Sequence, residues 1–196
     1  MSKVFVGIDP GQNGGLGMLD SRGGFLACWR WNQKDPLYLY NKLLLFRDLI
    51  GEVYLELIQT FPQKEKGIIT RNQATLVNWG IWQGWLMAAG LPFLIISPLT
   101  WQACHNLTGW ASKLEKNIKT HSPLTLARAK WPVAPLEHKV DDGKAVALLL
   151  ADLSCRDHQK GINRRALQEV AAKKKQTKKK ALRQARKASK PLPIGA

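Results

Sequence analysis

The sequence predicts a single α/β domain built on a mixed five-stranded sheet, with three antiparallel strands followed by two parallel ones and helices on the flanks. Three observations support this prediction. Short apolar segments joined by glycine turns open the chain, and apolar strands alternating with helical patterns follow them. The length of 196 residues is sufficient for one sizeable core.

The first three strands are predicted at residues 3–9, 14–20 and 24–31. They are rich in aliphatic and aromatic residues, which fit a pleated and buried surface. The glycine pairs Gly14-Gly15 and Gly23-Gly24 stand between them. Because short glycine-containing connections favour antiparallel neighbours, we expect an antiparallel meander at this end of the domain.

A helix is predicted next, from Asp35-Pro36 to about Ile50, because proline suits the first turn of a helix. Its expected apolar stripe consists of Leu37, Tyr40, Leu44 and Leu45. The segment 53–58 follows as a buried strand that contains one acid, Glu56. Residues 59–71 are polar and basic and are predicted to form a loop.

A long helix is predicted from Asn72, its expected N-cap, to Ala89, with Gly90 closing it. Small residues recur within it every four positions, at Gly80, Gly84 and Ala88. This smooth face is expected to pack on the sheet; the alternative is an interface between subunits. The remaining elements are a strand at 91–97 and helices at 98–106, 112–130 and 141–153.

Three acidic positions lie where the predicted elements begin or end. Asp9 ends the first strand, Glu56 lies in the fourth, and Asp141-Asp142 opens the last helix. A buried carboxylate is costly unless it is paired or binds a metal. Carboxylates from two strands and one helix start are suited to a hard divalent cation, which prefers oxygen ligands. The alternative for Asp9 alone is a structural strand ended by a turn.

The charge of the chain is concentrated at its C-terminal end. Of a formal net charge of +16, about +12 lies in residues 160–196, which hold 13 Lys or Arg and one acid, Glu169. We therefore predict two parts, a globular domain at 1–158 and a basic tail at 159–196 that is disordered or helical. Such a tail adds salt-dependent affinity for any nucleic acid; the alternative is a tail that only improves solubility.

The three cysteines form no CxxC pair, and no apolar run reaches the length of a membrane span. The first strand begins at once, without a secretory or transit segment before it. These features predict no membrane association and a reducing interior, the cytoplasm or nucleoid of a bacterium or phage-infected cell. An organelle stroma is the alternative if a transit peptide has been removed.

The predicted order of elements is that of a ribonuclease H-like fold, and four short motifs make the resemblance more specific. They are Gly7-Ile8-Asp9-Pro10-Gly11, Glu56 followed by Phe61-Pro62-Gln63, Ser97-Pro98-Leu99-Thr100-Trp101, and Asp141-Asp142-Gly143-Lys144-Ala145 before Ala147-Leu148-Leu149-Leu150-Ala151. Over residues 3–155 the chain resembles RuvC-type Holliday-junction resolvases, above all their chloroplast branch and its bacterial relatives. Any one of these motifs is weak evidence for the family, but four motifs in this order and at these spacings are much stronger evidence.

The resemblance implies an endonuclease that resolves four-way DNA junctions by hydrolysing phosphodiesters with two Mg²⁺ or Mn²⁺ ions per site. The acids that would hold the metals fall on Asp9, Glu56 and Asp142, and Asp141 is a further candidate ligand. The family's fourth acid falls on Val146, so this chain lacks one ligand. Either the site is weakened naturally or the sequence carries a disabling substitution.

The resemblance also implies branched DNA as the partner, and two-fold junction symmetry favours a homodimer. Candidate DNA contacts combine an aromatic with cations: Phe61, Lys64, Lys66, Arg71, Lys113 and Lys144. The alternatives are a plain surface loop around a core-facing Phe61 and solvated lysines. Because of Val146, two other functions stay open: a weak or inactive junction-binding protein, and a nuclease for other branched DNA or RNA–DNA hybrids.

Overall fold

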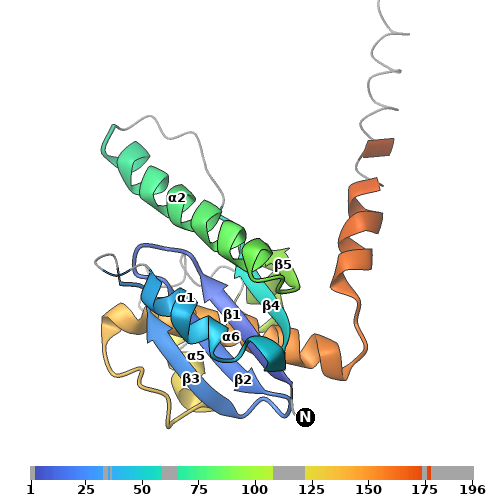
Figure 1. Cartoon of the computed structure of the whole chain (residues 1–196), viewed down its shortest axis with the longest axis horizontal. Helices are drawn as coiled ribbons and strands as arrows, with labels where there is room; N and C mark the ends of the chain where they lie inside the picture. The colour runs from blue at the N-terminus through green and yellow to red at the C-terminus, as the bar shows by residue number, and fades with distance from the viewer. Residues whose placement is uncertain are drawn as a thin grey trace, which may run out of the picture. The chain divides into compact units, whose positions relative to one another are not determined.

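A five-stranded mixed sheet forms the centre of the molecule (Figure 1). The computed structural model describes residues 3–32, 35, 37–58, 66–107, 122–173 and 176–177, without the side chains of residues 66–72. The strands are β1 (Val4–Asp9), β2 (Gly15–Asp20), β3 (Phe25–Arg30), β4 (Ile50–Glu56) and β5 (Phe93–Ile96), and their order across the sheet is β3-β2-β1-β4-β5.

The pairing of the strands confirms the predicted ribonuclease H-like α/β class. β1 pairs with β2 and β2 with β3 in antiparallel orientation, whereas β4 runs parallel to both β1 and β5. The chain must cross the sheet to make each parallel neighbour, and helices provide these connections. The three antiparallel strands lie within one residue of their predicted ends.

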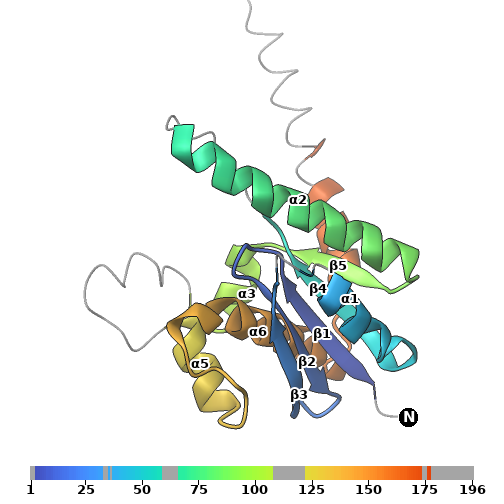
Figure 2. The ribbon, with the colours of Figure 1, turned by 60° about the vertical axis from the view of Figure 1, so that its left-hand side comes forward.

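Helices cover both faces of the sheet (Figure 2). On one face α6 (Asp142–Gln159) packs along the strands, together with α3 (Pro98–Cys104) and α5 (Pro123–Lys130). On the other face lie α1 (Leu37–Leu44) and α2 (Lys66–Ala88). Each face has its own apolar cluster, with Leu148 to Ala151 on the α6 side and Trp82 and Leu86 on the α2 side.

The helix predicted from Asp35 to about Ile50 is shorter in the structure. α1 ends at Leu44, and a short 3₁₀ turn (Arg47–Leu49) leads into β4. The buried residues of α1 are Leu39 and Leu43, whereas Leu45 is 74% exposed. Of the predicted stripe, Tyr40 and Leu44 are partly buried and pack against the core on the α2 side, whereas Leu37 and Leu45 are exposed, so half of the predicted stripe was wrong.

Helix α2 begins at Lys66, so the prediction of a loop to residue 71 with Asn72 as N-cap was wrong. Its contact with the sheet was also wrongly assigned. Trp82, Leu86 and Ala89 are buried against the sheet, whereas Gly80 and Gly84 are exposed, and no atom lies within 4 Å of a Cβ built on either. The small residues therefore face away from the sheet.

The last two helices differ from the prediction in their bounds. α5 begins at Pro123 because Ser122 caps it, its hydroxyl accepting from the Thr125 N–H at 3.1 Å, so no continuous helix spans 112–130. α6 extends past the predicted end at residue 153, and its last turns contain buried polar residues beside the exposed His158 and Gln159. There Asp157 accepts a hydrogen bond from the Tyr54 hydroxyl at 2.8 Å, joining the helix to β4.

The chain divides into two compact units, Met1–Lys160 and Gly161–Ala196. In the second unit residues 164–173 are helical, and the Asn163 side chain accepts from the Ala166 N–H at 3.0 Å. Within the described residues, no helix is both long and apolar enough to cross a membrane.

Candidate active site

Two acids lie side by side at the end of neighbouring parallel strands. Ile8 of β1 pairs with Leu55 of β4, so the next residues, Asp9 and Glu56, are also neighbours. Successive strand residues point to opposite faces. Ile8 and Leu55 belong to the core on the α2 side, and the two acids therefore face the side covered by α6.

A close backbone approach brings the third acid to this position. A Cβ on Gly7 would lie 2.0 Å from the carbonyl oxygen of Ala147, and one on Gly143 would lie 2.0 Å from that of Asn13. Only glycine permits these contacts. The first turn of α6, which carries Asp142, is thereby held against the turn that follows Asp9.

The pKa of each of the three carboxylates is raised, and Asp9 interacts electrostatically with both Asp142 and Glu56. Burial raises the pKa of Asp9 to about 6; the Gly11 N–H lowers it, and the charge of Asp142 adds to the increase. The pKa of Glu56 is raised to about 8, first by burial and then by the charge of Asp9. Burial also raises the pKa of Asp142, although Lys139 and Arg128 oppose the change. A cation placed among these groups would relieve all three penalties.

Two of the three acids, Asp9 and Glu56, are each held by a specific hydrogen bond. Asp9 accepts a hydrogen bond from the Gly11 N–H at 2.8 Å, and Glu56 accepts one from the indole N–H of Trp101 at 2.8 Å. The motif that contains Trp101 was visible in the sequence, but its contact with Glu56 was not predicted. The signal was the placement of that motif directly after β5, the strand that pairs with β4 at Glu56.

Asp9, Glu56 and Asp142 offer only carboxylate oxygens, which are the ligands that a hard divalent ion prefers. Among the described residues, however, no three His, Cys, Asp or Glu side chains form a ready metal-binding group. Val146 lies one turn after Asp142 on α6, partly buried against the core on that side. The position one turn from Asp142 is therefore filled by an apolar side chain.

Asp141 and Lys144 form an ion pair at the start of α6. Lys144 Nζ lies 2.8 Å from Asp141 Oδ1 and also donates to the Pro135 carbonyl. Asp141 Oδ2 accepts from the His138 N–H at 2.9 Å. These contacts outweigh burial and lower the pKa of Asp141. Both side chains stabilise the start of α6, so we leave Asp141 out of the proposed metal ligands and Lys144 out of the proposed DNA contacts.

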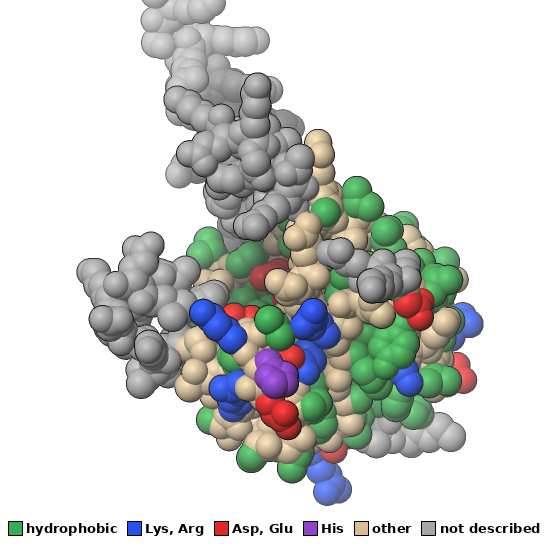
Figure 3. Space-filling view, turned by 90° about the vertical axis from the view of Figure 1, so that its left-hand side faces the viewer, with side chains coloured by type: hydrophobic (Ala, Val, Ile, Leu, Met, Phe, Trp, Pro, Cys, Tyr) green, Lys and Arg blue, Asp and Glu red, His purple; other side chains and the backbone are tan. Residues whose placement is uncertain are grey.

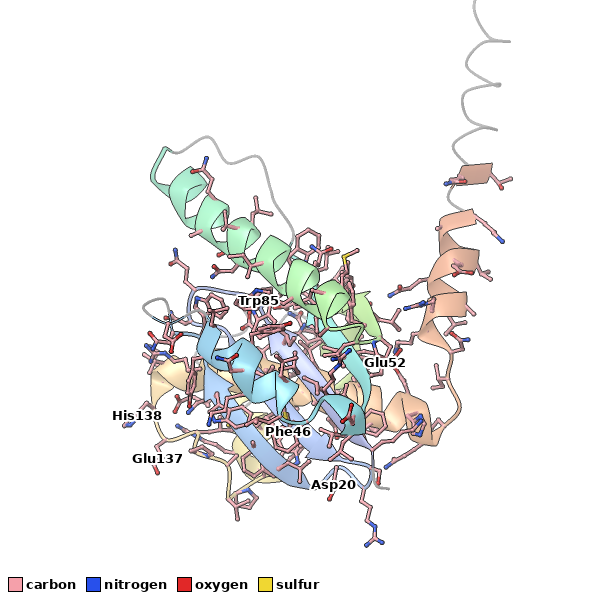
Figure 4. The ribbon with its side chains drawn as sticks, viewed as in Figure 1. Asp20, Phe46, Glu52, Trp85, Glu137 and His138 are labelled. Carbon is pink, nitrogen blue, oxygen red and sulfur yellow. The ribbon has the colours of Figure 1, made fainter. Side chains whose placement is uncertain are left out.

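Cations that the sequence analysis did not single out lie near Asp142. Arg128 donates to the carbonyls of Leu136 at 2.6 Å and Glu137 at 2.7 Å, which fixes the segment before α6. Lys139 in that segment is exposed. Figure 3 shows Lys and Arg side chains gathered around acidic ones and a histidine on this face, and Figure 4 shows Glu137 and His138 close together at the left-hand side of the molecule.

Three of the six predicted DNA contacts fall outside the described residues. This is the case for Phe61, Lys64 and Lys113. Lys66 and Arg71 lie in the first two turns of α2 rather than in a loop, and their side chains are not described. The predicted DNA-binding set therefore stays a prediction.

Two solved structures of Thermus thermophilus RuvC are similar to this chain. One, RuvC in complex with a Holliday junction substrate, is 15% identical, covers 82% of this chain and 97% of its own, and has a TM-score of 0.48. The other, a RuvC structure, is 19% identical with 81% and 97% coverage and a TM-score of 0.45. No protein-family model and no curated protein matches the sequence.

Proposed function

We propose that this chain is a divalent-metal-dependent endonuclease that resolves four-way DNA junctions by paired, symmetric cleavage. The observation that carries the proposal is the meeting of Asp9, Glu56 and Asp142, from β1, β4 and the start of α6, with the pKa of each raised. A buried group of like charges has a cost in stability, which is typical of a functional site. The resemblance of the four sequence motifs to those of junction resolvases supports a four-way junction as the substrate.

In this proposal Asp9, Glu56 and Asp142 hold the metal ions. When bound, divalent ions activate water and stabilise the leaving oxygen in phosphodiester hydrolysis. The chain supplies fixed carboxylates: the Gly11 N–H orients Asp9, and Trp101 orients Glu56. Lys139, exposed beside Asp142, is positioned to attract the DNA backbone. In this proposal water is the nucleophile.

Val146 favours a second candidate, a protein that binds junctions and cleaves them weakly or not at all. Its apolar side chain provides no oxygen ligand one turn from Asp142. Both candidates share the binding surface and differ only in the rate of hydrolysis. A nuclease for other branched DNA or for RNA–DNA hybrids would differ in substrate instead.

One assay separates these functions. A labelled four-way junction is incubated with the chain and Mg²⁺ or Mn²⁺, beside duplex, flap and RNA–DNA hybrid substrates. Resolution requires metal-dependent nicks at symmetric positions in two opposing strands. Binding without nicks supports the second candidate, and faster cleavage of a flap or hybrid than of the junction contradicts the proposed substrate.

We also propose that the basic tail increases affinity for all DNA without reading the branch. Deleting residues 160–196 should weaken binding to the junction and to duplex by similar factors. It should also reduce the slope of log affinity against log salt, because that slope reflects the number of phosphates neutralised. Titrations of both DNAs across salt concentrations measure this, and a loss of junction preference on truncation would show that the tail itself recognises the branch.

The exposed face of α2 supports the proposed homodimer. It carries Gly80, Gly84 and Ala88, with Val77 60% and Met87 69% exposed beside them. Helix α2 is thus apolar on the side away from the sheet as well, which is typical of a helix covered on both sides. A second copy of the chain suits this face, because a two-fold symmetric junction needs two sites.

Replacing Gly84 with glutamate should therefore disrupt the dimer and leave the domain folded. No atom lies within 4 Å of a Cβ at Gly84, and glutamate favours a helix more than glycine by roughly 0.5 kcal/mol or more. Light scattering after gel filtration should give the mass of a monomer for Gly84→Glu. In the cleavage assay, this variant should nick the two opposing junction strands independently and no longer as a pair. Val133→Glu, at a residue that is 78% exposed outside α2, is the matched control. An unchanged mass for Gly84→Glu contradicts the interface.

A further inference from the structure

Trp101 is a neutral side chain that reaches the acidic group from the interior. It is 2% exposed and lies one turn into α3, among the apolar residues that pack under α6. Its indole N–H donates to Glu56 Oε1 at 2.8 Å. An indole nitrogen donates but does not accept, so it binds the carboxylate without competing for a cation.

The local fold holds this donor rigidly. β5 pairs with β4 up to Glu56, and the Leu57 N–H donates to the Ile96 carbonyl at 2.8 Å. α3 begins immediately afterwards, where the Ser97 hydroxyl accepts from the Thr100 N–H at 3.2 Å. Trp101, which follows β5 in the chain, therefore lies against Glu56 at the end of the neighbouring strand β4. A buried indole on a capped helix has little freedom, so the position of Glu56 Oε1 is fixed.

We propose that Trp101 is a positioning residue for the metal site, holding Glu56 by Oε1 so that its second oxygen, Oε2, is directed at a divalent ion. This inference rests on the proposed metal site at Asp9, Glu56 and Asp142. Partners that hydrogen-bond metal ligands in this way orient the ligand before the ion arrives. The charge of Glu56 is stabilised by the same bond, which lowers its pKa against the effect of burial.

The chain contains a matched control. Trp82 is 0% exposed, lies on the opposite face of the sheet, and its indole N–H has no hydrogen-bond partner among the described residues. Replacing either tryptophan with phenylalanine removes the same atoms from a buried core. Only Trp101→Phe also removes a contact with Glu56.

The first test measures Mn²⁺ binding to the full chain by calorimetry. Trp101→Phe should weaken Mn²⁺ binding by about 10-fold, within the range typical of partners that hold metal ligands, and Trp82→Phe should leave it unchanged. If both variants lose thermal stability similarly and bind Mn²⁺ as the parent does, the hydrogen bond is only structural and the proposal is wrong. Failure of the parent to bind Mn²⁺ also overturns it.

The second test uses the indole N–H signals in NMR spectra of ¹⁵N-labelled protein. The two phenylalanine variants assign the Trp101 and Trp82 signals. Adding Mg²⁺ should shift the Trp101 signal and not that of Trp82; equal or absent shifts contradict the proposal. Junction cleavage is measured separately: metal binding that depends on Trp101 without any junction cleavage would support this inference and refute the proposed function.

Discussion

Replacing Asp9 with asparagine is expected to abolish metal-dependent junction cleavage and, at pH 8, to stabilise the metal-free domain. Asparagine keeps an oxygen that can accept from the Gly11 N–H, so the turn after β1 is preserved. The charge that would bind a metal is lost. Junction binding should persist, because the proposed DNA contacts lie on other residues.

The expected gain in stability follows from the pKa of Asp9. It is about 6 in the folded protein against an ordinary 3.8, so the folded state holds the proton more tightly than the unfolded state. The free energy of unfolding therefore falls as the pH rises from about 4 to about 6, and stays lower above that. The asparagine variant has no such penalty. At pH 8 the free energy of unfolding of Asp9→Asn should exceed that of the parent by on the order of 2 kcal/mol, or roughly 5 °C in Tm. This difference should vanish near pH 4.

Asp157→Asn is the contrasting variant. Asp157 is also buried, but it accepts a hydrogen bond from Tyr54 and lies near the far end of α6. Its replacement should lower Tm, because a neutral amide accepts from the Tyr54 hydroxyl more weakly than a carboxylate does, and it should leave the cleavage rate per folded molecule unchanged. Thermal melts across pH, with parallel cleavage assays at saturating Mg²⁺, compare the two. Cleavage by Asp9→Asn at the parent rate would eliminate the proposed site.

The sheet was predictable because its signals are local. Glycine pairs between short apolar segments mark the antiparallel strands, and Glu56 within an apolar segment marks the fourth. The meeting of Asp9 with Glu56 then follows from parallel pairing. Asp142 could be placed near them only through the fold, since the contact of Gly143 with Asn13 joins residues far apart in sequence.

Other features depend on tertiary contacts that no local pattern specifies. α2 contains apolar residues all around its axis, so the sequence could not show that Trp82, rather than Gly84, faces the sheet. The pairing of Asp141 with Lys144 was likewise not predicted from the sequence. Their ion pair satisfies the charges that had suggested a metal ligand and a phosphate contact.

Replacing Val146 with glutamate is expected to increase metal-dependent junction cleavage by on the order of 10-fold or more, because it adds a carboxylate one turn from Asp142. Val146 is only partly buried, so a longer polar side chain has a route toward solvent and the site. Without metal, the added charge should lower Tm, since it joins acids whose pKa values are already raised.

Val146→Gln separates the effect of charge from that of shape. Glutamine has nearly the same size and polarity as glutamate but no negative charge, so it should not raise cleavage. Mn²⁺ should restore the Tm of Val146→Glu more than that of Val146→Gln, because only the acid gains a cation as partner. If the unmodified chain already cleaves as fast as Val146→Glu, then position 146 is not the site of a missing ligand, and the three acids suffice for hydrolysis.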